Sequence, residues 1–171
     1  MDAIVLQLEI PLETVAHAIR RGRSWGVPVI LDAGPPCPNP PKEFFDVDVL
    51  SPNEAEAAAL TGMAVGDDES AEAAAREMLR RGARAVVIKR GGKGALLATE
   101  KECVRLPAHR VNVVDTTAAG DAFTAALAVR LAEGADLRSA VETANRAGAL
   151  ACARFGAQPS MPTRSECEAL G

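Results

Sequence analysis

Val113-Val-Asp-Thr-Thr-Ala-Ala-Gly-Asp-Ala-Phe123 is the stretch from which the rest of this sequence is best interpreted. Its two carboxylates, Asp115 and Asp121, bracket a run of small residues, and a helical pattern from 122 to 131 follows at once. Small side chains let a ligand approach the backbone, and the N–H groups at a helix N-terminus favour anions. The helix dipole likewise favours the ionised form of an aspartate in the first turn. Spacing alone leaves two interpretations open: a phosphoryl-transfer loop whose aspartate accepts a hydroxyl proton, or an Asp-capped helix after a tight turn.

Composition narrows the class of protein. The 171 residues suffice for one domain with a sizeable core, and 48% hydrophobic with 25% charged residues is ordinary for a globular protein. The net charge of −4 argues against a nucleic-acid or membrane-surface partner, and one Trp with no Tyr argues against base stacking. No apolar run reaches the length of a membrane span, and the chain opens on an apolar strand rather than a signal peptide. We therefore expect a cytoplasmic protein that binds small molecules.

Cysteine and histidine chemistry is not supported by the spacing. The four cysteines contain no C-x-x-C pair, so reduced thiols are preferred over zinc or disulfides; they are Cys37, Cys103, Cys152 and Cys167. His17 and His109 lie far from each other and from any nucleophile motif, which indicates ordinary surface residues.

Hydrophobic periodicity predicts alternating strands and helices. Apolar runs predict strands at 3–10, 27–31, 47–50, 85–89, 95–98 and 102–108. Helical patterns cover 12–25, a short segment that Ser51-Pro-Asn-Glu opens and Thr61-Gly62 closes, 67–81, 121–133, a long segment ending near 155, and 164–170. This order favours a mostly parallel sheet with helices on both faces. Residues at the carboxyl ends of the strands should gather along one edge as a ligand site; they are Glu9, Asp32, Asn53, Gly91 and Asp115.

The 115–123 stretch resembles the signature D-T-x-G/A-A-G-D-x-F of the ribokinase family of sugar and nucleoside kinases. Supporting pieces occur in family order at 7–11, 51–56, 90–94 and 156–162, and the first and last resemble the ribokinase branch more than the fructokinase or adenosine kinase branches. The resemblance runs from Ala3 to the end. It implies an α/β, ribokinase-like fold, a mostly parallel sheet in a three-layer α/β/α arrangement, with residues 1–171 as the C-terminal, nucleotide-binding part.

The resemblance also implies roles for individual residues. Asp121 is similar to the family's catalytic base, which also contacts the sugar, and Ala118, Ala119 and Gly120 match its anion hole. The other matched positions are Asn53 and Glu56, which help organise Mg²⁺ and the phosphates; Glu9 at the sugar; Asn53, Lys89, Gly91, Gly94 and Asn145 at ATP; and Asp115, Thr117, Ala151, Gly156 and Ser160 around a monovalent cation, expected to be K⁺.

Simpler interpretations stand beside several of these roles. Asn53-x-x-Glu56 is also an ordinary capping pattern, and Gly91 to Gly94 is a turn in either case. Glu9 at a strand end could be solvated, and Asn145 could be a plain exposed helix residue.

Two departures from the family pattern matter. Lys89 stands where the family commonly has Thr or Ser, and Arg90 where it has a small or apolar residue. The extra charges either contact phosphates or disturb the pocket. The sequence also begins after the family's G-x-x-N-x-D motif, Gly-Gly loop and lid strands. We therefore expect an unpaired sheet edge and an apolar face, retained nucleotide binding, and poor sugar affinity and turnover.

The resulting hypothesis is transfer of the ATP γ-phosphoryl group to a sugar hydroxyl, with the 5-hydroxyl of D-ribose as first choice. One alternative is another sugar or nucleoside kinase of the family. A second is a truncated, non-catalytic nucleotide-binding module, whose partner would be a separate N-terminal half or a second copy in a homodimer. A dinucleotide-dependent oxidoreductase is disfavoured, because no G-x-G-x-x-G follows the first strand.

Overall fold

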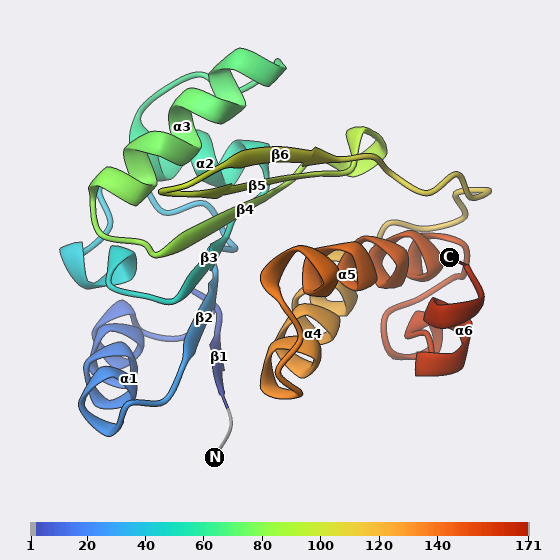
Figure 1. Cartoon of the computed structure of the whole chain (residues 1–171), viewed down its shortest axis with the longest axis horizontal. Helices are drawn as coiled ribbons and strands as arrows, with labels where there is room; N and C mark the ends of the chain where they lie inside the picture. Colours follow the sequence, from blue (N-terminus) through green and yellow to red (C-terminus); the bar gives the residue numbers. More distant parts are fainter. Residues whose placement is uncertain (1–2, 171) are drawn as a thin grey trace. The chain divides into compact units, whose positions relative to one another are not determined.

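The computed structural model describes residues 3–170, so the two ends of the predicted domain, 1–2 and 171, lie outside the described residues. The chain forms two compact units: unit 1 comprises Met1–Arg90 and Leu96–Arg105, and unit 2 comprises Gly91–Ala95 and Leu106–Gly171 (Figure 1). Among the helices of residues 3–170, none is long and apolar enough to cross a membrane.

A six-stranded sheet is the framework of unit 1 (Figure 1). Its strands follow one another in chain order: β1 (Ile4–Leu6), β2 (Val29–Asp32), β3 (Val49–Ser51), β4 (Ala85–Lys89), β5 (Ala95–Thr99) and β6 (Cys103–Leu106). The first four are parallel to their neighbours, whereas the links from β4 to β6 are too short for a parallel crossover. The sheet is therefore mostly parallel, as expected.

Three helices complete unit 1: α1 (Leu12–Trp25), α2 (Glu54–Thr61) and α3 (Asp68–Arg80). One face of α1 is apolar, and Val15 and Ile19 on that face are fully buried. At Gly22 the helix lies so close to the sheet that an added β-carbon would be 2.5 Å from Val29 Cγ2. Burial of this apolar face, rather than helix propensity, accounts for most of the helix's stability.

Unit 2 is helical: α4 (Ala119–Ala132), α5 (Leu137–Cys152) and α6 (Arg164–Ala169). Short 3₁₀ segments lie at Lys42–Phe45 in unit 1 and at Gly91–Lys93 and Gln158–Ser160 in unit 2. Helices α4 and α5 pack tightly, because Gly148 brings α5 to within 3.3 Å of the Ala119 carbonyl, measured from an added β-carbon. Both helices are alanine-rich, which permits this approach.

Two element boundaries differ instructively from expectation. The first strand is three residues long rather than eight, because the chain leaves the ladder and the Leu8 N–H donates to the Gly34 carbonyl at 2.8 Å. The helix expected from Asp121 begins at Ala119, so Asp121 lies inside the first turn.

Candidate active site

The segment 115–121, here called the anion loop, leads directly into α4 of unit 2. Ala118 is the N-cap residue of α4 and has a left-handed backbone (φ 60°, ψ 10°), which is uncommon for a residue other than glycine. A left-handed residue followed by helical ones aims successive N–H groups into one concavity, an arrangement that binds anions. The N–H groups of the first turn also have no acceptor within the helix. The backbone at Ala118 is therefore consistent with the predicted anion hole, which stays a prediction. The Ala119 N–H donates to the Thr116 carbonyl at 3.3 Å.

Asp121 lies in the first turn of α4 and is exposed. The Asp-capped-helix interpretation is wrong, because Ala118 is the N-cap and makes no side-chain cap hydrogen bond. The carboxylate is therefore not used as the helix cap.

Asp115 ties the anion loop to the 156–160 segment. Its Oδ1 accepts from the Thr117 N–H at 3.0 Å and from the Thr117 hydroxyl at 2.7 Å, while Oδ2 accepts from the Gly156 N–H at 2.9 Å. The Cys152 carbonyl accepts from the N–H groups of Val114 and Asp115 at 2.8 and 3.2 Å. These bonds bring Asp115, Thr117 and Gly156 of the predicted cation site together.

The other two predicted cation ligands, Ala151 and Ser160, lie within five residues of Gly156 in sequence, and both already have hydrogen-bond partners. The Ala151 carbonyl accepts from the Arg154 N–H at 3.2 Å. Ser160 is fully buried, and its hydroxyl donates to the Ala157 carbonyl at 2.7 Å. All five predicted ligands supply oxygen atoms, which is the donor chemistry that hard cations prefer.

Acid should weaken the Asp115 contacts. Hydrogen bonds from the Thr117 hydroxyl and from the Gly156 and Thr117 N–H groups hold the Asp115 pKa below its ordinary value of 3.8. A depressed folded-state pKa contributes stability that is present above pH 3.8 and is lost as pH falls through the lower folded-state value. We expect Asp115→Asn to unfold at lower urea than the wild type at pH 7, with a gap that narrows below pH 3.8. A gap that stays constant from pH 7 to pH 3 would contradict this assignment.

Asn53 and Glu56 form a closed capping box at the start of α2 in unit 1. The Asn53 N–H and Nδ2 donate to the two Glu56 carboxylate oxygens, both at 2.7 Å, and the Glu56 N–H donates to Asn53 Oδ1 at 2.9 Å. Burial raises the pKa of Glu56 above its ordinary value, against the Asn53 hydrogen bond and the charge of Lys89, which lower it. The capping interpretation is confirmed, while the magnesium role stays a prediction.

The two unusual cations of unit 1 are both paired. Lys89 Nζ donates to both Asp32 oxygens, at 2.6 and 2.7 Å. The Arg90 guanidinium is buried and bonds to Glu54 at 3.0 Å and to Asp68 at 2.5 Å. Both charges are therefore engaged within the protein, and neither is a free phosphate contact in this state.

A divalent cation does not fit directly onto the carboxylates of Asp32 and Glu56, here called the carboxylate cluster. No group of three His, Cys, Asp or Glu side chains placed to hold a metal occurs in the region 3–170. An ammonium group already bridges the Asp32 oxygens, and both Glu56 oxygens accept from Asn53.

The turn predicted to lie against the nucleotide, Gly91 to Gly94 in unit 2, packs on the segment Leu106–Ala108. Gly94 has φ +90°, and a β-carbon there would lie 2.0 Å from the Leu106 carbonyl oxygen. Asn145 Nδ2 donates to the carbonyls of Leu106 and Pro107, at 3.3 and 3.1 Å. Asn145 is therefore not a plain exposed residue, because it fixes the same segment that Gly94 contacts. Gly91 closes the turn by accepting from the Gly94 N–H at 2.9 Å.

The expectation that residues at the carboxyl ends of the strands gather along one edge is confirmed for Asp32 and Asn53. In unit 1, Asp32 is in register with Ser51, and Asn53 pairs with Lys89, so the ends of β2, β3 and β4 meet at one edge. Glu9 is exposed beyond β1, as the solvated interpretation expects. Sequence reasoning missed the Lys89–Asp32 pair, although both residues end buried strands.

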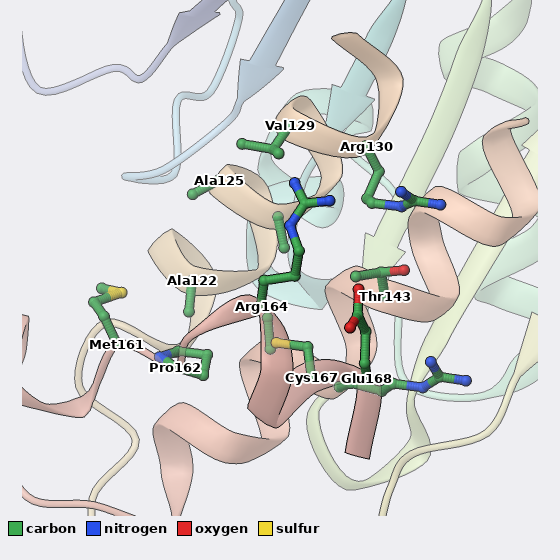
Figure 2. A pocket seen from close by; sticks show the side chains of 13 residues that line it. Ala122, Ala125, Val129, Arg130, Thr143, Met161, Pro162, Arg164, Cys167 and Glu168 are labelled. Carbon is green, nitrogen blue, oxygen red and sulfur yellow. The ribbon is translucent and has the colours of Figure 1, made fainter. Parts of the chain in front are cut away.

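A cavity of about 590 Å³ in unit 2 is lined by none of the predicted site residues, although Ala122 and Met161 in its lining directly follow Asp121 and Ser160. Figure 2 shows Ala122, Ala125 and Val129 of α4 on one side and Arg164, Cys167 and Glu168 of α6 on the other. Helix α4 consists mostly of apolar residues, and Ala122, Ala125 and Val129 line this cavity.

Comparisons with known proteins agree with this architecture. The sequence profile described as pfkB family carbohydrate kinase matches residues 1–164. Ribokinase from Bacillus subtilis is 38% identical over 170 residues, which are 99% of this chain and 55% of that protein. Deoxyribokinase from Salmonella typhi is 38% identical over 161 residues, 94% of this chain and 53% of that protein.

A solved structure shows the same fold. The structure of Arabidopsis thaliana ribokinase complexed with ribose and ATP superposes with a TM-score of 0.93 and 37% identity, covering 99% of this chain and 55% of that one. The chain thus spans about half the length of the relatives it matches. With a matching profile over most of its length and a ribokinase-like fold, the chain belongs to the pfkB family of carbohydrate kinases.

Proposed function

We propose that this chain is the nucleotide-binding part of an ATP-dependent sugar kinase, and that it transfers the γ-phosphoryl group to a sugar hydroxyl. The observation that carries the proposal is the left-handed Ala118 at the start of α4, followed in the first turn by Asp121. A strained residue other than glycine at such a position is typical of a functional site.

The anion loop and Asp121 would share the chemistry of transfer. The N–H groups of Ala118, Ala119 and Gly120, with that of Asp121, would stabilise the charge that develops on the transferring phosphoryl group. The Ala119 N–H, which donates to the Thr116 carbonyl at 3.3 Å, would exchange this long bond for the phosphoryl oxygen. The Asp121 carboxylate would accept the proton of the attacking sugar hydroxyl, as general-base aspartates do in kinases.

Metal ions would have separate roles. Mg²⁺ would enter as part of the Mg–ATP substrate, since it binds chiefly through phosphates and retained waters. A K⁺ ion, held by oxygens of Asp115, Thr117, Ala151, Gly156 and Ser160, would supply positive charge beside the anion loop. Asp115 itself would keep the loop and the 156–160 segment joined, through its bonds to Thr117 and Gly156.

Isothermal titration with Mg–ATP tests the anion loop. We expect the wild type to bind, and Gly120→Val to lose affinity at least about tenfold, because a branched side chain at this position crowds the backbone that the phosphates must approach. Ala132→Val is the matched control, since it places the same β-branched side chain at the exposed end of the same helix. Equal binding by folded wild type and Gly120→Val would refute the proposal.

D-ribose is the first choice of sugar, and 2-deoxy-D-ribose is the specific competitor. The relatives named ribokinase and deoxyribokinase are equally similar to this chain, at 38% identity. A coupled ADP-release assay that compares kcat/KM for the two sugars decides between them.

We further propose that efficient turnover requires the equivalent of the remaining half of the relatives. Two features of the chain support this. Val5 on the edge strand β1 is 46% exposed, and the α4 side of the cavity in Figure 2 is lined by Ala122, Ala125 and Val129. Co-expression with an N-terminal half from the same source should raise sugar phosphorylation, and normal ribose saturation by the chain alone would contradict this requirement.

A further inference from the structure

Three strands of unit 1 place polar side chains on one face of the sheet at its carboxyl edge. Asp32 is in register with Ser51, and Asn53, two residues farther along and so on the same face, pairs with Lys89. Asp32 and Ser51 are buried, with exposed fractions of 4% and 0%. The Ser51 hydroxyl is buried without a hydrogen-bond partner in the described part of the chain. A buried polar cluster of this kind calls for a physical explanation.

Two carboxylates converge within this cluster. A β-carbon placed on Gly34 would lie 2.9 Å from Glu56 Oε1 and 3.8 Å from Asp32 Oδ1, so both oxygens lie within 4 Å of one point. Like charges buried in one cluster are stabilised by a neighbouring cation. Lys89 supplies it, with its ammonium 2.6 Å from Asp32 Oδ1 and its side chain only 13% exposed.

Oxygen atoms from two carboxylates and a hydroxyl are also what a small divalent cation selects. In this chain, the Lys89 ammonium is bonded to both oxygens of Asp32, one of these carboxylates. We propose that Lys89 is a resident cation, which holds Asp32 and Glu56 together and keeps divalent metal ions out of the carboxylate cluster.

This inference goes beyond the proposed transfer reaction and does not depend on it. It makes Lys89 a positioning residue rather than a phosphate ligand. It also means that a divalent ion would be brought by the nucleotide rather than stored at Asp32.

The test titrates the protein with Mn²⁺ in the absence of nucleotide. The concentration of free Mn²⁺ is measured from its electron paramagnetic resonance signal. Lys89→Met removes the ammonium but keeps most of the side-chain volume, whereas Lys89→Arg keeps the charge. We expect Lys89→Met to bind one Mn²⁺ at least about tenfold more tightly than the wild type or Lys89→Arg. The new site should disappear in Lys89→Met/Asp32→Asn.

Thermal unfolding provides the second measurement, in case Lys89→Met is too unstable to titrate. Mn²⁺ should raise the unfolding temperature of Lys89→Met, because an ion that binds only the folded state stabilises it, and should not raise that of the double variant. Mn²⁺ binding by the wild type as tight as by Lys89→Met would overturn the proposal. So would the absence of both binding and thermal rescue in Lys89→Met.

Discussion

Replacing Gly94 with alanine should destabilise unit 2 by at least about 3 kcal/mol, well above the effect of an average substitution. The added β-carbon would lie 2.0 Å from the Leu106 carbonyl oxygen, 2.6 Å from the Ala108 nitrogen and 2.7 Å from the Pro107 carbonyl carbon. All three are backbone atoms, so no side-chain rotation relieves the overlap. The backbone at φ +90° adds conformational strain for any residue with a β-carbon.

Gly92→Ala is the matched control, because it changes the same turn. A β-carbon on Gly92 meets nothing within 4 Å, and the residue does not have a positive φ. Urea unfolding followed by circular dichroism should show a large loss of stability for Gly94→Ala and a change within about 0.5 kcal/mol for Gly92→Ala. Similar unfolding of the two variants would show that the Leu106–Ala108 segment does not pack on Gly94 as described.

Much of the fold could be predicted from sequence because local signals and tertiary packing agree. Helix α1 was predicted to the residue, since Pro11 precedes it and Gly26, with φ 66°, terminates it. Strand β4 was equally clear, as a run of buried apolar residues. The strand expected at 3–10 was too long, because nothing in the apolar run Ala3 to Ile10 reveals that Leu8 turns to bond with Gly34.

The candidate site could be predicted less evenly. The signature 115–121 predicts an anion hole at this segment, but only backbone geometry shows that Ala118 is left-handed and that the helix begins before Asp121. The partners of Lys89 and Arg90 are 57, 36 and 22 residues away in sequence, so a single sequence could not reveal whether these charges were free for phosphate. Lys89 at the end of β4 reaches Asp32 on β2 across the intervening strand β3, and this neighbourhood is a property of the assembled sheet.

Asp121→Asn should lower kcat for sugar phosphorylation by about 10²–10⁴-fold and leave Mg–ATP affinity nearly unchanged. The amide is close in size to the carboxylate and keeps the helix start, but it cannot accept the hydroxyl proton. Stopped-time ADP release and isothermal titration measure the two quantities on the preparation whose wild-type form phosphorylates the sugar, with or without a co-expressed N-terminal half.

Asp136→Asn is the control for this substitution. Asp136 is the exposed N-cap of α5, where its carboxylate accepts from the Ser139 N–H at 2.9 Å, and asparagine caps helices about as well as aspartate. Turnover and stability should therefore both survive the control. Both variants replace an aspartate with asparagine at the start of a helix: Asp121→Asn at α4 and Asp136→Asn at α5.

The division between kcat and KM is what assigns the role of Asp121. A residue that accepts the proton acts in the transition state, so its loss lowers kcat and kcat/KM together. Loss of a residue that only holds the sugar raises KM and leaves kcat unchanged. A rise in sugar KM with an unchanged kcat would therefore make Asp121 a binding residue and remove the general base from the proposed reaction. The proposed role of the anion loop would then depend only on the Mg–ATP titration of Gly120→Val.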